Sequence, residues 1–314
     1  MAEQAQPAKL SAENSAEQSE EQLEEQRVAE MAALVERAKN TVCLKPYEIS
    51  DELRPKIDEL DLWDNVAELR DQGYTVVRDV ASPEVFDQLR EAIHTIAQES
   101  DGSFKDVGGS MLLGRHPAVD TVATLPKILA VAEASIGQGM RASQFVGSIL
   151  REGQGALSLH ADANWIPAPF PEHNTVLTFC MPCEGMTDEG GATRVVPGSQ
   201  TLRRHPTPKE LEDAEHIALE VEKGSVAVWD GAVWHSGGIR SIPGTRTVLH
   251  ATYQRLYAQP IDDYTYLLED EAYVANASKE LLGLLGADLF YGTATFNSGV
   301  DLAKFMKSTI LSKR

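Results

Sequence analysis

The sequence predicts a mainly β protein with flanking helices. Between about residues 140 and 257, short runs rich in β-branched and aromatic residues are separated by Gly, Pro and Asn. Several short strands at such spacing are typical of a sandwich or a barrel. On both sides of this region apolar residues recur at spacings of three and four, which is the period of a helix that packs one face.

The region before the β-rich core is predicted to be helical with one strand. Periodicity favours helices at 63–72, 82–97 and 126–136 and a strand at 74–78. Ser82 and Pro83 suit the N-cap and first position of the second helix. We interpret residues 41–61, which contain Pro55, as a connector. The glycine-rich segment 100–116 is expected to be a loop that could close over a site.

The strands of the core and the helices that follow it complete the predicted domain. Strands are predicted at 143–151, 175–181, 194–196, 217–221, 225–229 and 247–257, and helices at 264–275, 278–285 and 301–312. We therefore expect a single domain over residues 41–314. Its barrel core spans about 140–257, and a C-terminal helical extension spans about 261–314.

The first 40 residues form an acidic tail. Residues 1–20 are mostly Ala, Glu, Gln and Ser, so we expect them to be disordered, because they cannot bury enough apolar surface to fold. From about Gln22 apolar residues return at helical spacing. This stretch is either an amphipathic helix that forms a homo-oligomer or docks elsewhere, or a frayed tail helix, since the pattern is too short for a coiled coil.

Charge and cysteine content exclude several kinds of function. The formal net charge of −20 argues against nucleic acid and anionic membranes as partners, because both reward Lys and Arg. No stretch approaches the ~20 apolar residues of a membrane span. Three Cys and the lack of a recognisable secretory signal favour the cytoplasm. Cys180 and Cys183 form a C-x-x-C, but a zinc site would need a second pair.

Three residues near predicted strand ends form a candidate metal site. His160 and Asp162 lie two positions apart, so their side chains leave the same face of a strand. His235 is expected at the end of another strand. Two His and one carboxylate make the facial triad that suits non-haem Fe(II). A His-x-Asp pair arises often by chance, so the hypothesis depends on the whole set, which includes Arg246 eleven residues after His235.

Together these residues resemble the phytanoyl-CoA dioxygenase family. The matching positions are His160, Asp162, His235, Arg246 and the segment 190–199, Gly-Gly-Ala-Thr-Arg-Val-Val-Pro-Gly-Ser. The resemblance covers roughly residues 60–260. It departs from the family pattern at Gln200, where a His usually follows Pro-Gly-Ser. It implies a double-stranded β-helix core, which is a cupin-like jelly roll, and an oxygenase that depends on Fe(II) and 2-oxoglutarate.

The resemblance also assigns roles to the site residues. It implies that His160, Asp162 and His235 hold Fe(II), and that Arg246 binds the distal carboxylate of 2-oxoglutarate. Arginine suits that role because it is always charged and binds carboxylates in a bidentate manner. With O2 as the other cosubstrate, the family oxidises small organic molecules and releases succinate and CO2. Asp162 favours hydroxylation or a related oxidation, because relatives that halogenate replace this carboxylate by a small residue.

Further candidates rest on their predicted positions. Gln144 resembles a family position that contacts 2-oxoglutarate, and Thr178 on the next strand is a candidate for the same site. Trp165, three residues after Asp162, is a candidate wall of the substrate pocket. For each of them ordinary packing is the alternative, and packing is the role we expect for Trp229.

Two other functions are compatible with the same sequence. One is a metal-dependent isomerase or hydrolase that uses the fold without O2. The other is a non-catalytic binding protein that uses the acidic tail as its contact. The substrate is left open, because only the family name implies a coenzyme A thioester and no basic cluster in the sequence demands a CoA phosphate.

Overall fold

The computed structural model describes residues 22–26, 28–29, 32, 45–99 and 108–287. The chain divides into two compact units, Met1–Cys43 and Leu44–Arg314. In the first unit the described residues are helical, as expected from about Gln22 onwards. The predicted disorder of residues 1–20, part of the predicted loop at 100–116 and the predicted helix at 301–312 lie outside the described residues.

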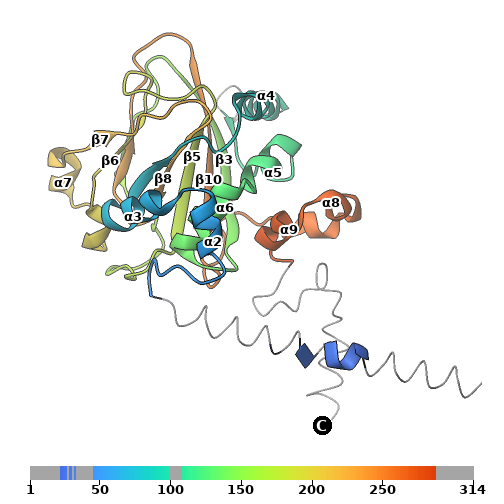
Figure 1. Cartoon of the computed structure of the whole chain (residues 1–314). Helices are drawn as coiled ribbons and strands as arrows, with labels where there is room; N and C mark the ends of the chain where they lie inside the picture. The colour runs from blue at the N-terminus through green and yellow to red at the C-terminus, as the bar shows by residue number, and fades with distance from the viewer. Residues whose placement is uncertain (1–21, 27, 30–31, 33–44, 100–107, 288–314) are drawn as a thin grey trace, which may run out of the picture. The chain divides into compact units, whose positions relative to one another are not determined.

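Two antiparallel sheets form the core of the second unit (Figure 1). The strands are β1 Tyr74–Val77, β2 Gly108–Gly109, β3 Arg141–Arg151, β4 Leu157–His160, β5 Val176–Pro182, β6 Thr193–Val195, β7 Ile217–Ala218, β8 Val226–Asp230, β9 His235–Gly237 and β10 Thr245–Gln254. The six-stranded sheet has the order β1-β8-β5-β10-β3-β2, and the four-stranded sheet has the order β4-β9-β6-β7. From β3 to β6 and from β8 to β10 the chain alternates between the sheets, which confirms the predicted jelly roll. Strands β1 and β2 join from outside the predicted core range.

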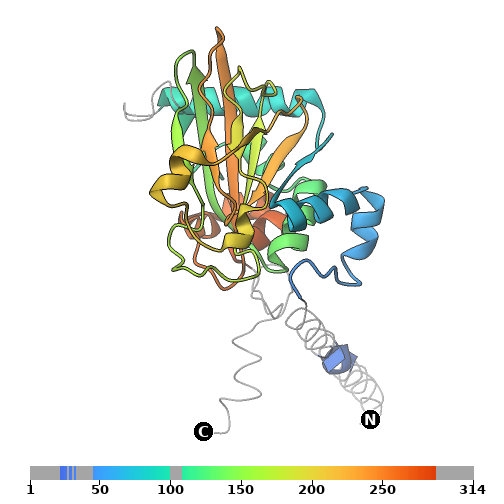
Figure 2. The same ribbon diagram turned by 90° about the vertical axis from the view of Figure 1, so that its left-hand side faces the viewer.

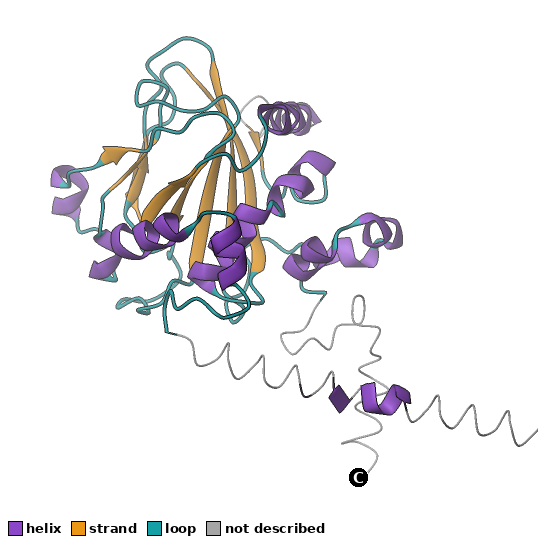
Figure 3. Cartoon of the chain, in the orientation of Figure 1, coloured by secondary structure: helices purple, strands orange, loops and turns teal. Residues whose placement is uncertain are grey.

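The helices lie mainly on one side of the six-stranded sheet, opposite the four-stranded sheet (Figures 2 and 3). They are α2 Arg54–Glu59, α3 Trp63–Gln72, α4 Pro83–Glu99, α5 Pro117–Ala123, α6 Pro126–Ile136, α7 Pro208–Asp213, α8 Glu271–Asn276 and α9 Lys279–Leu285, with 3-10 helices η1 Ser199–Leu202 and η2 Thr265–Glu269. None of the described helices is long and apolar enough to cross a membrane.

The sheet separates two layers of buried apolar residues. Its outer face packs with the helices in one large cluster that includes Phe145 of β3 and Tyr253 of β10. Its inner face and the four-stranded sheet share a second, smaller cluster that includes Trp229, Val248 and Val195. Along most of β3, buried residues on the helix side alternate with partly exposed residues on the inner side. Solvent therefore reaches the space between the sheets.

Some predicted elements need correction. Residues 41–61 contain the helix α2, because Pro55 lies in its first turn, where a missing N–H costs no hydrogen bond. The helices α5 and α7 were not predicted, although Thr207 and Glu210 form a capping box at the start of α7 that the sequence pattern could have revealed. The expected helix at 264–275 is divided into η2 and α8, because Asp270 caps a new helix there.

Candidate metal and cosubstrate site

The two candidate histidine ligands face each other across a strand pair. His160 ends β4 and is the Cα partner of His235, which begins β9 instead of ending a strand as the sequence predicted. His160 Nδ1 lies 2.8 Å from the carbonyl oxygen of Ser158, and His235 Nδ1 lies 3.2 Å from that of Val233. A carbonyl only accepts, so each Nδ1 carries the proton and each Nε2 is left as a ligand.

Asp162 completes the cluster and divides its two oxygens between two tasks. Its Oδ1 lies 3.6 Å from His160 Nε2 and 3.4 Å from His235 Nε2. Its Oδ2 accepts hydrogen bonds from Thr178 Oγ1 at 2.8 Å and Trp229 Nε1 at 3.0 Å. One oxygen is therefore anchored while the other faces both imidazoles. The ligand atoms of the three residues lie within 4.8 Å of one another, which fits a divalent cation held on one face.

The electrostatics of the cluster favour the ligand forms of these residues. Burial opposes ionisation of Asp162, but the nearby His235 and the hydrogen bonds from Thr178 and Trp229 hold the pKa of this carboxyl below its usual range. Burial and the charge of His235 lower the pKa of His160, which stays neutral. Burial lowers the pKa of His235, but Asp162 outweighs it and raises this pKa overall. The negative charge that would hold a proton there would also attract a metal cation.

Arg246 is a buried cation on the same side of the six-stranded sheet. It is 5% exposed, and its Nη1 donates a hydrogen bond to the carbonyl oxygen of Gly191. Its Nε has no hydrogen-bond partner among the described residues, and no carboxylate there forms an ion pair with it. Burial lowers its pKa from the usual value. A buried guanidinium with an unsatisfied N–H fits the carboxylate of a bound anion such as 2-oxoglutarate.

The three remaining predicted site residues lie at different distances from the metal ligands: one contacts Asp162, and the other two have no described contact with the ligands. Thr178 holds Asp162 and touches Thr252 Oγ1 at 3.2 Å, so it supports the metal ligand directly. Gln144 is the partner of Thr252 across β3 and β10 and lies on the partly exposed inner face. Trp165 is 54% exposed on the loop that follows Asp162. Contacts of Gln144 with 2-oxoglutarate and of Trp165 with substrate stay predictions.

The structure gives Trp229 a role that the sequence did not predict. Trp229 is a hydrogen-bond donor to Asp162 as well as a packing residue, and no local sequence signal marks this contact. Cys180 and Cys183 are both free and fully buried, and burial raises the pKa of Cys180 to about 11. Cys183 packs in the large cluster on the helix side of the sheet, and Cys180 packs in the smaller cluster between the sheets.

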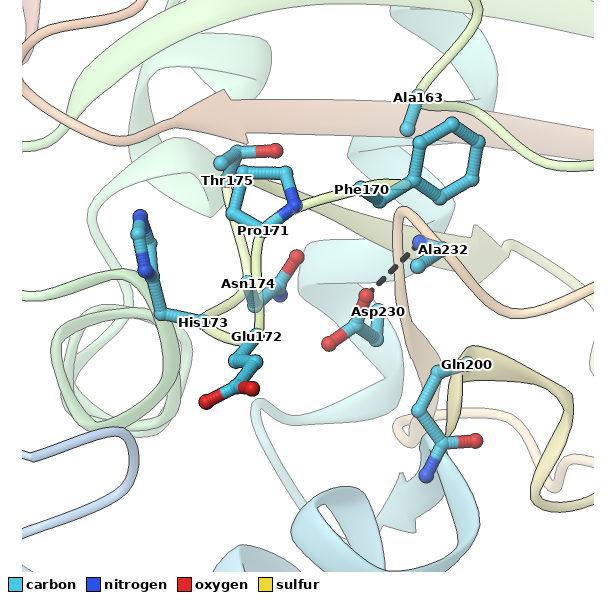
Figure 4. A pocket seen from close by; sticks show the side chains of 10 residues that line it. All are labelled: Ala163, Phe170, Pro171, Glu172, His173, Asn174, Thr175, Gln200, Asp230 and Ala232. Carbon is cyan, nitrogen blue, oxygen red and sulfur yellow. Dashed lines mark hydrogen bonds between the residues drawn. The ribbon is translucent and has the colours of Figure 1, made fainter. Parts of the chain in front are cut away.

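A small pocket lined by Ala163, Phe170 and Asp230, among others, contains none of the metal ligands (Figure 4). Asp230 lines it and accepts a hydrogen bond from the backbone N–H of Ala232 at 2.8 Å. Because Trp229 and Asp230 alternate along β8, they leave opposite faces of the sheet. This pocket is therefore separate from the space between the sheets that the metal ligands face.

Fold and site together define a jelly-roll protein with a facial triad. A family model described as phytanoyl-CoA dioxygenase (PhyH) matches residues 69–248, more than half of the 314 residues. The chain therefore belongs to this family, as the sequence motifs predicted, and this family consists of 2-oxoglutarate-dependent dioxygenases.

Two curated fungal proteins are similar to parts of the chain. Dioxygenase af480 of Aspergillus fumigatus is 28% identical over 164 residues, which cover 51% of this chain and 52% of that protein. Dioxygenase aneA of Aspergillus aculeatus is 29% identical over 120 residues, which cover 37% of this chain and 40% of that protein. The chain thus spans about half the length, or less, of the curated relatives it matches.

Solved structures share the fold at low sequence identity. The non-heme alpha ketoglutarate dependent epimerase SnoN from nogalamycin biosynthesis has a TM-score of 0.52 at 22% identity, covering 67% of this chain and 88% of that one. EctD from S. alaskensis with bound Fe has a TM-score of 0.54 at 17% identity, covering 63% and 79%. These similarities support the jelly-roll assignment.

Proposed function

We propose that the protein is an Fe(II)- and 2-oxoglutarate-dependent dioxygenase that hydroxylates or otherwise oxidises a small organic metabolite, with release of succinate and CO2. The observation that carries this proposal is the convergence of His160, Asp162 and His235 on the same inner surface that holds the unsatisfied guanidinium of Arg246. A metal-binding triad alone would serve many reactions. Since no carboxylate of the described residues forms an ion pair with this buried cation, it adds a reason for a dicarboxylate cosubstrate.

Each residue has a defined task in this proposal. The unprotonated Nε2 atoms of His160 and His235 and the free oxygen of Asp162 hold Fe(II). Fe(II), together with 2-oxoglutarate and O2, supplies the chemistry that oxidises an unactivated C–H bond. Arg246 binds the distal carboxylate of 2-oxoglutarate and neutralises its charge. The apolar cluster between the sheets includes Trp229, whose ring packs against that of His235 and keeps this side of the site apolar.

The open side of the triad supports access by substrate. The side chain of His160 is 27% exposed and that of Asp162 is 23% exposed, whereas that of His235 is 6% exposed. We therefore propose that substrate approaches past His160 and Asp162. Asp162 favours hydroxylation, desaturation or ring closure over halogenation, and the proposed compartment is the cytoplasm because the sequence has only three Cys.

The proposal is tested with anaerobically prepared protein and Fe(II). We expect 2-oxoglutarate to bind with the visible absorption of a chelated Fe(II) complex, and addition of O2 and ascorbate to release succinate. His160→Ala should abolish metal binding. Arg246→Ala should retain Fe(II) but weaken 2-oxoglutarate binding at least about 100-fold, the loss expected for a charged bidentate contact. Arg70→Ala, which removes an exposed ion pair with Asp71, is the matched control.

Two results would contradict the proposal. Wild-type protein that holds Fe(II) but forms no complex with 2-oxoglutarate would exclude this cosubstrate. Substrate turnover that persists without O2 would favour the isomerase or hydrolase alternative.

A further inference from the structure

One buried carboxylate in the segment that leads to His235 has no task in the proposed function. Asp230 is the last residue of β8 and is 5% exposed. Its side chain leaves the sheet on the face opposite to Trp229, so it does not point at the metal ligands. Burying a carboxylate costs free energy unless its oxygens find partners, so its position at this strand end calls for an explanation.

Asp230 closes the turn that joins β8 to β9. Its Oδ1 accepts a hydrogen bond from the backbone N–H of Ala232 at 2.8 Å (Figure 4). Its carbonyl oxygen accepts a second one from the backbone N–H of Val233 at 2.9 Å. Asp and Asn are favoured in such turns because their side chains reach the backbone two residues further on. The side chain of Asp230 therefore holds residues 230–233 in one conformation.

This turn carries the carbonyl group that orients His235. The carbonyl oxygen of Val233 lies 3.2 Å from His235 Nδ1 and accepts its hydrogen bond. The partner of the second nitrogen fixes the tautomer and the ring orientation of a metal-binding imidazole. A change in the turn would therefore move this carbonyl group, and with it the Nε2 atom that faces the metal.

The same turn also contacts the backbone next to Asp162. The carbonyl oxygen of Gly231 accepts a hydrogen bond from the backbone N–H of Ala163 at 2.9 Å, and Ala163 directly follows Asp162. The turn is packed tightly against β5, because a Cβ atom at Gly231 would lie 2.6 Å from the Cβ of Val176. One turn thus connects to the backbone beside two of the three metal ligands.

We propose that Asp230 is a positioning residue that sets the geometry of His235 and Asp162 through the turn 230–233. This assignment rests on the proposed function, which makes these two residues ligands of Fe(II). The task needs a hydrogen-bond acceptor that reaches the N–H of Ala232, and it does not need a negative charge. The effect of a substitution at this position therefore depends on whether the new side chain keeps that acceptor.

The test compares substitutions of Asp230 by their affinity for metal. Fe(II) is titrated without O2 against a chromogenic chelator, and the visible absorption of bound Co(II) reports the geometry of the ligands. Asp230→Ala removes the acceptor and should weaken Fe(II) binding about 10-fold, the lower end of the effect of groups that orient metal ligands, and should change the Co(II) spectrum. Asp230→Asn keeps the acceptor and should bind Fe(II) within about twofold of the wild type.

Two further variants complete the comparison. Asp230→Ser keeps an oxygen that closes such turns more weakly than Asp or Asn, so its affinity for Fe(II) should be roughly threefold below that of the wild type. It decides the question if Asp230→Ala does not fold. Tyr47→Phe is the matched control, because Tyr47 donates to the other oxygen of Asp230, Oδ2, at 3.3 Å and leaves the turn intact. Its affinity should equal that of the wild type.

The outcomes separate positioning from a merely structural role. A structural role would lower the free energy of unfolding but leave the Fe(II) affinity and the Co(II) spectrum of the folded variants unchanged, and that result would overturn the inference. Equal losses in Asp230→Asn and in Asp230→Ala or Asp230→Ser would also overturn it, because they would assign the effect to charge. Wild-type protein that binds no Fe(II) would instead contradict the proposed function itself.

Discussion

Thr178→Val tests whether the support beneath the metal ligand has the importance that the geometry gives it. The substitution keeps the shape of the side chain but removes the hydroxyl that donates to Asp162 Oδ2 at 2.8 Å. Trp229 Nε1, at 3.0 Å from the same oxygen, then remains as the second donor. Thr178 is 3% exposed, so no water easily takes the place of the lost donor.

The expected size follows from these contacts. A hydrogen bond to a charged group contributes about 1.5–3 kcal/mol, and partners of metal ligands typically change metal affinity 10- to 100-fold. Because Trp229 still holds the carboxylate, we expect the lower end, about a 10-fold weaker affinity for Fe(II), which corresponds to about 1.4 kcal/mol. The pKa of Asp162 should rise at the same time, since one of the donors that stabilise its ionised form is lost.

The measurement is an anaerobic competition for Fe(II) against a chromogenic chelator. Thr252→Val is the matched control, because Thr252 touches Thr178 at 3.2 Å but makes no described hydrogen bond to Asp162, and its affinity should stay within about twofold of the wild type. If Thr178→Val binds Fe(II) as tightly as the wild type, or if Thr252→Val loses as much, the hydrogen bond to Asp162 does not position the ligand.

Three further predictions concern stability and reactivity. Burial raises the pKa of Asp230 to about 6, so the folded protein keeps a proton that the unfolded chain releases near pH 4. The free energy of unfolding should therefore decrease as the pH rises from about 4 to about 6. Urea unfolding should show that Asp230→Asn removes about 2 kcal/mol of this decrease. If the free energy of unfolding of the wild type and of Asp230→Asn changes equally with pH, the reasoning is refuted. Gly237→Ala places a Cβ 2.3 Å from the carbonyl oxygen of Gly155, so we expect β4 to shift and the thermal midpoint to drop by several degrees; an unchanged midpoint would contradict the packing. Cys180 and Cys183 are fully buried, and native protein should leave both unmodified by a thiol reagent that labels them after denaturation, with peptide mapping as the readout.

Local patterns were sufficient for most of the regular elements. The helices α3 and α6 have the predicted bounds, because Gly73 and Gly137 end an apolar period at a residue that tolerates positive φ. The helices that were missed have six or seven residues, too few to show a period, and only their capping residues mark them. Strand lengths were overestimated where a β-rich run passes into a turn, as in β7.

Part of the candidate site could be predicted from the sequence, and part only from the tertiary structure. His160, Asp162, His235 and Arg246 were identified from residue type and spacing, because metal and carboxylate binding demand particular functional groups. Of their partners, Thr178 was predicted at the site but for the cosubstrate. The contact of Trp229 was not predicted, because its ring nitrogen reaches Asp162 across the barrel, between positions 67 residues apart.

The sequence by itself determined the functional groups of the site, which are two imidazoles, a carboxylate and a guanidinium. It also determined that they belong to a β-rich chain that resembles one family. Tertiary structure alone decided which oxygen of Asp162 is anchored and which histidine nitrogen is free. The physical reason is that residue types are local properties of the chain, whereas hydrogen-bond partners and burial depend on the register of strands that are distant in sequence. In this protein β3 and β10, about 100 residues apart, meet in an antiparallel pair, and no local pattern in the sequence fixes that register.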